Sequence, residues 1–141
     1  MNNLASLLAF ACLLAGCSHS GSNTRVKIVN PEFTGVGEQE AVPVRARLLK
    51  EVEGHYSELI ECYDHGREHN GTLHGRVTVK FTVAPSGEVV GLSDGGGTTM
   101  PSSDVIDCVQ GAFTRMKFAS WEGKPVVAVL PIEFVVPGLV G

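Results

Sequence analysis

Residues 73–83 alternate between apolar and polar side chains, and this run constrains the fold more than any other part of the sequence. One face carries Leu73, Gly75, Val77, Val79, Phe81 and Val83, and the other carries His74, Arg76, Thr78, Lys80 and Thr82. A period of two residues predicts a β-strand with one buried and one solvated face. Ala84-Pro85-Ser86-Gly87 then supplies turn residues, so we expect residues 88–93 to return beside the strand as a hairpin.

Two other stretches show the three- and four-residue spacing of apolar side chains that is typical of helices. The first runs from Val44 to Gly66, and Gly54 weakens its middle enough to allow a kink or a break. Asn70-Gly71 ends this helix. The second helix is capped by Ser102 or Ser103. Its inner face consists of Val105, Cys108, Val109, Ala112, Phe113 and Met116.

The last predicted strand runs from Pro125 to Val136. Pro131 lies within it and has no backbone N–H, which favours a position at the edge of the sheet. The order helix, strand, strand, helix, strand predicts an α+β fold, with a three-stranded antiparallel sheet and two helices on one of its faces. We place this domain at residues 44–137. Residues 17–43 are expected to be a flexible tether, in which residues 25–29 alternate like a short strand.

The first 16 residues carry no charged side chain and form an apolar run with the length of a secretory signal. Leu14-Ala15-Gly16-Cys17 resembles the lipobox of bacterial lipoproteins, which implies removal of residues 1–16 and acylation of Cys17 by chains such as palmitate. A buried N-terminal helix is the alternative, but the run has no amphipathic pattern. Ser18 resembles the sorting signal for the outer membrane. We therefore expect a lipid-anchored envelope protein that faces the periplasm, with the bilayer as a partner through Cys17.

Export makes the four cysteines informative, because the compartment outside the cytoplasm is oxidising. Cys12 leaves with the leader and Cys17 is acylated, so Cys62 and Cys108 remain as a pair. Each lies on the apolar stripe of a predicted helix, and a disulfide would join the two helices. Two reduced core cysteines are the alternative.

Charge and motifs exclude several classes of function. The net charge is −4 and no basic stretch occurs, so nucleic-acid binding is not expected. No pattern of a nucleophilic catalyst is present, and we expect neither an enzyme nor a cofactor. His65 and His69 stand four residues apart on one helical face, one turn after Glu61. Zinc favours such a pair but needs three or four ligands, so a metal site at His65 and His69 is only an alternative.

Several of these segments resemble the myxobacterial AgmX/PglI C-terminal domain, which is similar in fold to the C-terminal domain of TonB. The resemblance covers residues 44–136 and is carried by Glu61-Cys62-Tyr63-Asp64, residues 73–81, Ala84-Pro85-Ser86-Gly87, Asp107-Cys108-Val109, Lys117-Phe118 and Leu130-Pro131-Ile132-Glu133-Phe134. It implies a protein-interaction domain of the envelope, in energy transduction or motility machinery.

In TonB-like domains the last strand meets an extended segment of the partner. An exposed sheet edge is a template for such an added strand. The predicted partner-binding residues are therefore Val126, Val127, Ala128, Val129 and Leu130. The partner is expected to be another envelope protein. A small metal- or ligand-binding envelope lipoprotein is the alternative function.

Overall fold

The structure, a computed structural model, describes residues 22–139. The elements in chain order are β1 (Arg25–Ile28), β2 (Glu32–Thr34), α1 (Glu38–Gly54), α2 (Tyr56–His69), β3 (Arg76–Val83), β4 (Val89–Asp94), α3 (Ser103–Arg115) and β5 (Val126–Val135). The class is α+β, as predicted. Within the described residues, no helix combines the length and the apolar content needed to cross a membrane.

The strands form one five-stranded antiparallel sheet in which β5 lies between β3 and the N-terminal strands, and β4 lies outside β3. β1 pairs with the C-terminal half of β5, and β2 pairs with its N-terminal half. The predicted numbers, three strands and two helices, were therefore too low, because residues 22–139 alone form five strands and three helices.

The two extra strands come from the segment that we expected to be a tether. β1 confirms the predicted short strand. The prediction of a tether over residues 17–43 fails from Arg25 onward, because β1 and β2 lie in the sheet and α1 begins at Glu38. The side chain of Thr24 is buried and donates a hydrogen bond to Asp64 of α2 at 2.7 Å. The folded domain thus includes Thr24, well before the predicted start at residue 44.

The predicted first helix is two helices that meet at His55. α1 ends at Gly54 and α2 starts at Tyr56, which confirms a break at the weak point of the sequence. His55 lies near carboxylates on both sides, with its ring nitrogens 3.6 Å from Glu51 and 3.4 Å from Glu58.

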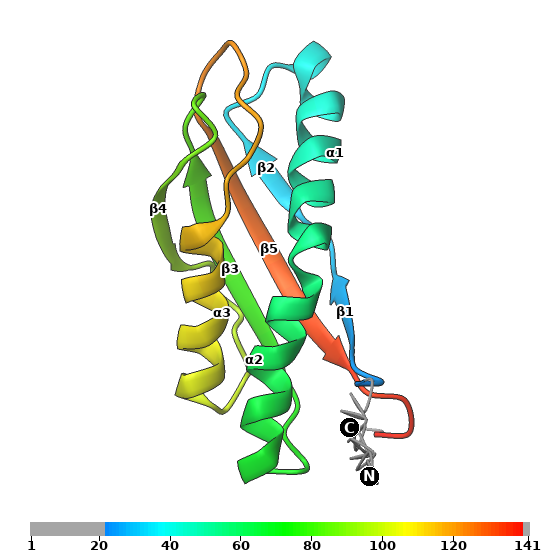
Figure 1. The fold of residues 1–141 in the computed structure, drawn as a ribbon. Coiled ribbons are helices and arrows are strands. Elements are labelled where there is room, and N and C mark those ends of the chain that lie inside the picture. Colours follow the sequence, from blue (N-terminus) through cyan, green and yellow to red (C-terminus); the bar gives the residue numbers. More distant parts are fainter. Residues whose placement is uncertain (1–21, 140–141) are drawn as a thin grey trace, which may run out of the picture.

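Among the elements of residues 22–139, the three helices all cover one face of the sheet and none lies on the other (Figure 1). The core lies between these layers, where the apolar face of β3 meets the helices. Tyr63 of α2 stacks on Phe134 of β5 with 4.6 Å between ring centroids, and Phe81 of β3 meets Phe113 of α3 at 5.1 Å. The hydroxyl of Tyr63 donates to the carbonyl oxygen of Leu73 at 2.5 Å, so this buried polar group has a partner.

Candidate functional site

The predicted partner-binding strand is not at an edge. Val126, Val127, Ala128, Val129 and Leu130 all lie in β5, which pairs with β3 on one side and with β1 and β2 on the other. Val126, Ala128 and Leu130 point into the core and are buried. The prediction that this strand is an open edge was therefore wrong.

The reason lies in how Pro131 is accommodated. In an antiparallel ladder the N–H and C=O of one residue point to the same side. The carbonyl oxygen of Pro131 accepts a hydrogen bond from the Val29 N–H at 3.0 Å, so its nitrogen faces the N-terminal strands. Those strands bulge there, since two residues, Asn30 and Pro31, lie between Val29 and the next pairing of Glu32 with Val129. The position at which Pro131 lacks an N–H therefore lies beside this bulge, where the ladder between β5 and the N-terminal strands is interrupted.

The open edge of the sheet next to β3 is β4. Gly95 donates its N–H to the carbonyl oxygen of Thr78 at 2.8 Å, which shows that alternate residues of β3 beginning with Thr78 face β4. The pairs Lys80–Ser93 and Thr82–Gly91 therefore exchange the ladder hydrogen bonds. The backbone N–H and C=O of Leu92, between these pairs, point away from β3. Within residues 22–139, no other strand pairs with this side of β4.

The loop after β4 prolongs the pairing of β3. The Thr98 hydroxyl oxygen accepts from the Thr78 N–H, and the Thr99 hydroxyl oxygen accepts from the Arg76 N–H, both at 3.0 Å. The Asp94 carboxylate holds this loop by accepting from the Thr98 hydroxyl at 2.6 Å and from the Gly96 N–H at 2.7 Å. These hydrogen bonds lower the pKa of Asp94, and the bond from Thr98 has the largest effect.

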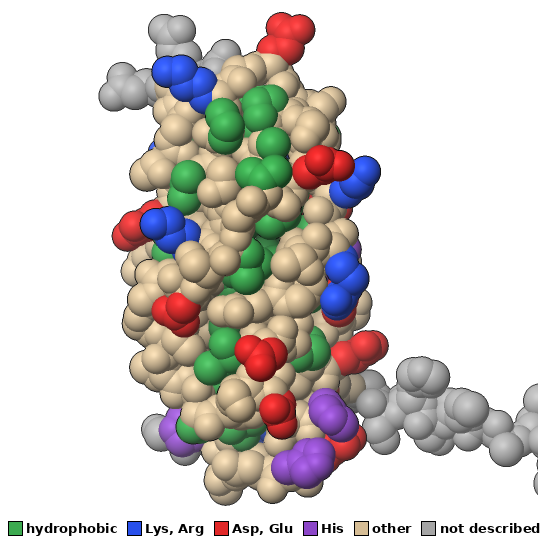
Figure 2. Space-filling view, turned by 90° about the vertical axis from the view of Figure 1, so that its left-hand side faces the viewer, with side chains coloured by type: hydrophobic (Ala, Val, Ile, Leu, Met, Phe, Trp, Pro, Cys, Tyr) green, Lys and Arg blue, Asp and Glu red, His purple; other side chains and the backbone are tan. Residues whose placement is uncertain are grey.

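Apolar side chains gather on the side of the molecule that carries β4 and α3. Figure 2 faces this side and shows apolar side chains in its upper and central parts, with acidic side chains and histidines in its lower part. Val90 of β4 is 62% exposed. Leu92 and Val89 are half-buried against the core. The edge therefore offers both backbone groups and an apolar side chain to a partner.

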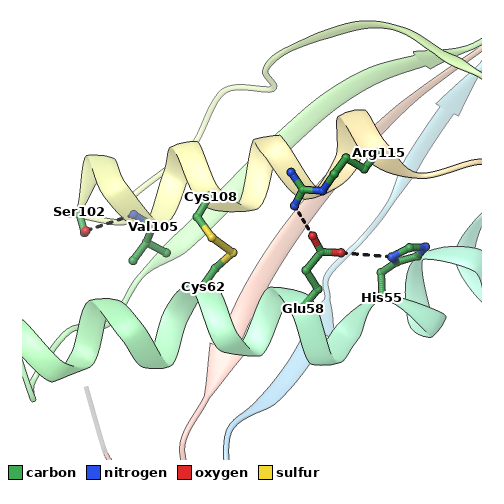
Figure 3. The surroundings of a disulfide bond; sticks show 7 residues. All are labelled: His55, Glu58, Cys62, Ser102, Val105, Cys108 and Arg115. Carbon is green, nitrogen blue, oxygen red and sulfur yellow. Dashed lines mark hydrogen bonds and ion pairs between the residues drawn. A yellow bond between two sulfur atoms is a disulfide. The ribbon is translucent and has the colours of Figure 1, made fainter.

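The predicted disulfide is present. Cys62 of α2 and Cys108 of α3 are joined with their Cα atoms 5.6 Å apart, so the bond links two helices across the face of the sheet (Figure 3). Cys62 is buried, whereas Cys108 is exposed. Ser102 is the predicted cap of α3 and accepts from the Val105 N–H at 3.3 Å.

A second link between the same helices lies one turn from the disulfide. Arg115 of α3 donates to Glu58 of α2, and His55 approaches the other carboxylate oxygen (Figure 3). The hydrogen bond from Arg115 is the main reason that the pKa of Glu58 lies below its usual value, and the contact with His55 acts in the same direction. Both partners are partly exposed, so this ion pair is a weaker link than the disulfide.

His65 and His69 lie together at the end of α2, with ring centroids 5.5 Å apart. Nδ1 of His65 is 3.3 Å from the Glu68 carboxylate, and Nδ1 of His69 is 3.3 Å from the carbonyl oxygen of His65. In the part of the chain that the structure describes, no three His, Cys, Asp or Glu side chains are grouped so that they could hold a metal ion.

Cys17 lies outside the described residues. The sequence did not indicate the β4 edge as a candidate site, although the alternation of residues 73–83 and the turn after them located the hairpin correctly. Comparison with known proteins adds no relative, because no family model, no curated protein and no solved structure matches the chain.

Proposed function

We propose that this chain is a lipid-anchored protein of the bacterial envelope whose domain binds an extended segment of another envelope protein and catalyses no reaction. The observation that carries the proposal is the outer side of β4, where the backbone groups of Leu92 face outward beside the exposed side chain of Val90. Such an edge accepts a further strand through main-chain hydrogen bonds, and neighbouring side chains select the sequence.

β4 is a better template than the opposite edge of the sheet. It is one strand of six residues, with a bulge at Val90 opposite the step from Thr82 to Val83. The opposite edge consists of β1 and β2, which have four and three residues and are separated by Asn30 and Pro31. Asn30 has a positive φ of 48° and Pro31 has no N–H, so an added strand would lose its register there.

The arrangement of the elements supports a TonB C-terminal-like domain of the AgmX/PglI type. The helical pair α1–α2, then β3, β4, α3 and β5, repeats the order that the resemblance implies, with the helices on one face of the sheet. β1 and β2 are additions that cover the last strand. We therefore place strand addition at β4.

The proposed lipid anchor sets the orientation of the domain. Cys17 stands five positions before Ser22, and five residues span at most about 18 Å. The end that carries the start of β1 and the end of β5 would then face the membrane (Figure 1).

Cys17→Ser should yield unprocessed or soluble protein. A mature N-terminus at another residue, without acyl mass in mass spectrometry, would refute the anchor.

Variants of the edge test the proposed function. Leu92→Pro removes the outward N–H and leaves the Lys80–Ser93 and Thr82–Gly91 pairs, and Val90→Lys places a charge beside the edge. Val42→Lys is the matched control, because Val42 is 72% exposed on α1. The lipoprotein would be isolated from detergent-solubilised envelopes, and the proteins bound to it identified. The two edge variants should no longer bind proteins that the wild type binds, whereas the control variant should still bind them. Folded edge variants that keep every partner would refute strand addition at β4.

A further inference from the structure

A groove lies between α1 and the segment that follows α3. Its volume is about 290 Å³, and its apolar walls are formed by Val44 and Leu48 of α1 and by Phe118 and Trp121 of the facing segment. In Figure 1 this segment is the orange loop at the top of the molecule, and α1 lies across from it. The groove is separate from the β4 edge, and nothing in the proposed strand addition uses it.

The facing wall is held in place by backbone hydrogen bonds. The Phe118 N–H donates to the carbonyl oxygen of Gly87, and the Trp121 N–H donates to that of Pro85, both at 2.9 Å. The indole Nε1–H of Trp121 donates to the carbonyl oxygen of Lys124 at 3.1 Å. Leu48 and Phe118 are only 3% and 6% exposed, so they belong to the rigid core. The groove is therefore formed before any ligand enters.

Two cations, Arg47 and Lys50, lie at the rim of this groove. Both are exposed, and neither forms an ion pair with a residue whose side chain the structure describes. Glu51 also lines the groove, so the three charged side chains there, Arg47, Lys50 and Glu51, carry a net charge of +1. The rim therefore presents positive charge beside an apolar floor, on a chain with a net charge of −4.

We propose that this groove binds a small amphipathic carboxylate, with an aromatic or short aliphatic body. The body would lie between Leu48, Phe118 and Trp121, and the carboxylate would lie near the Arg47 guanidinium and the Lys50 ammonium group. The volume stands at the lower end of the range for small-molecule sites, which favours a compact ligand over a long chain. Charge-assisted hydrogen bonds to carboxylate would fix the orientation of the ligand.

The chain contains one tryptophan, and Trp121 lies in the groove, so its fluorescence reports binding there. We would titrate the full-length lipoprotein in detergent with 3-phenylpropionate and with its uncharged analogue 3-phenylpropanamide. For a ligand of this size we expect a saturable change with a dissociation constant on the order of 1 mM for the acid. The amide should bind roughly three- to tenfold more weakly, because it has no negative charge to pair with the two cations. Added salt should reduce this difference.

Arg47→Ala with Lys50→Ala should remove the preference for the acid. Both side chains are exposed, so the double substitution should leave the fold intact. The matched control is Lys27→Ala with Lys80→Ala, which removes two exposed cations from the helix-free face. This control should leave the preference for the acid unchanged. Val44→Glu places a carboxylate against the groove and should weaken binding of the acid. Absence of a saturable change, equal binding of acid and amide, or an unchanged preference in the Arg47/Lys50 variant would each overturn the proposal.

Discussion

Val29 and Pro131 lie opposite each other in the sheet and share one hydrogen bond where two ordinary residues would exchange two. The Val29 N–H donates to the carbonyl oxygen of Pro131 at 3.0 Å, and Pro131 has no N–H to donate in return. The N-terminal segment bulges at Asn30 and Pro31 directly after this contact. A proline thus lies in an interior strand without interrupting the pairing of β5 with β3.

This relationship predicts that prolines at neighbouring positions of β5 differ sharply in their effect. Val129 pairs with Glu32, and the alternation of the ladder directs its N–H toward β2. Val129→Pro should lower the free energy of unfolding by about 1–3 kcal/mol, because it leaves an acceptor of β2 unpaired. Pro131→Val should change it by less than about 1 kcal/mol. Urea unfolding measures both values, and a Val129→Pro variant as stable as the wild type would contradict the interior position of β5.

The disulfide should contribute strongly to stability, because it closes a loop with a sequence separation of 46 residues. Replacement of both Cys62 and Cys108 by Ala should lower the free energy of unfolding by about 2–5 kcal/mol. The same loss should follow reduction of the wild type. Two free thiols in protein extracted under alkylating conditions would show that the bond does not form in the cell.

Two helical glycines make a matched pair for the packing of α2 on α3. A Cβ at Gly66 would lie 2.4 Å from Cγ2 of Val105, whereas a Cβ at Gly54 would meet nothing within 4 Å. Gly66→Ala should therefore destabilise the fold by about 1–3 kcal/mol through overpacking. Gly54→Ala should stabilise it by up to about 1 kcal/mol, since alanine favours the helix. Thermal unfolding with the disulfide intact compares them, and equal shifts of the two midpoints would contradict this close approach of the helices.

The ion pair between Glu58 and Arg115 predicts a dependence of stability on pH. The pKa of Glu58 in the folded protein is lowered, chiefly by the hydrogen bond from Arg115, so the carboxylate stabilises the fold above its unfolded pKa. This contribution is lost as the pH falls through the folded pKa. Because both side chains are partly exposed, it is at most about 1 kcal/mol.

Glu58→Gln should thus be less stable than the wild type at pH 7, and the difference should shrink at pH 3. Glu61→Gln, on the exposed face of the same helix, is the control and should show no such change. If the free energies of unfolding of Glu58→Gln and the wild type differ by the same amount at both pH values, this ion pair does not have the proposed role.

Local patterns in the sequence located most of the elements correctly. The hairpin of β3 and β4, the cap of α3 at Ser102 and the break of the first helix at Gly54 all follow from short-range rules. Each depends on the period of a single segment or on one turn or cap residue.

The position of β5 could not be predicted in this way. It depends on β1 and β2, and β2 has only three residues, too few to show a period. The rule that a proline marks an edge strand failed because a bulge in a distant segment accommodates Pro131. Because β1 and β2 pair with β5, the candidate site lies on β4 and not on β5. No single stretch of sequence shows this pairing.

The central claim, strand addition at β4, is tested most directly by a photo-crosslinking amino acid placed at Val90 in the intact lipoprotein in the cell. Val42 of α1, which is also highly exposed, is the control position. We expect a discrete crosslinked protein adduct at Val90 that is absent at Val42 and is lost when Leu92→Pro is added. An adduct that survives Leu92→Pro in a folded protein, or the same adduct at both positions, would contradict it.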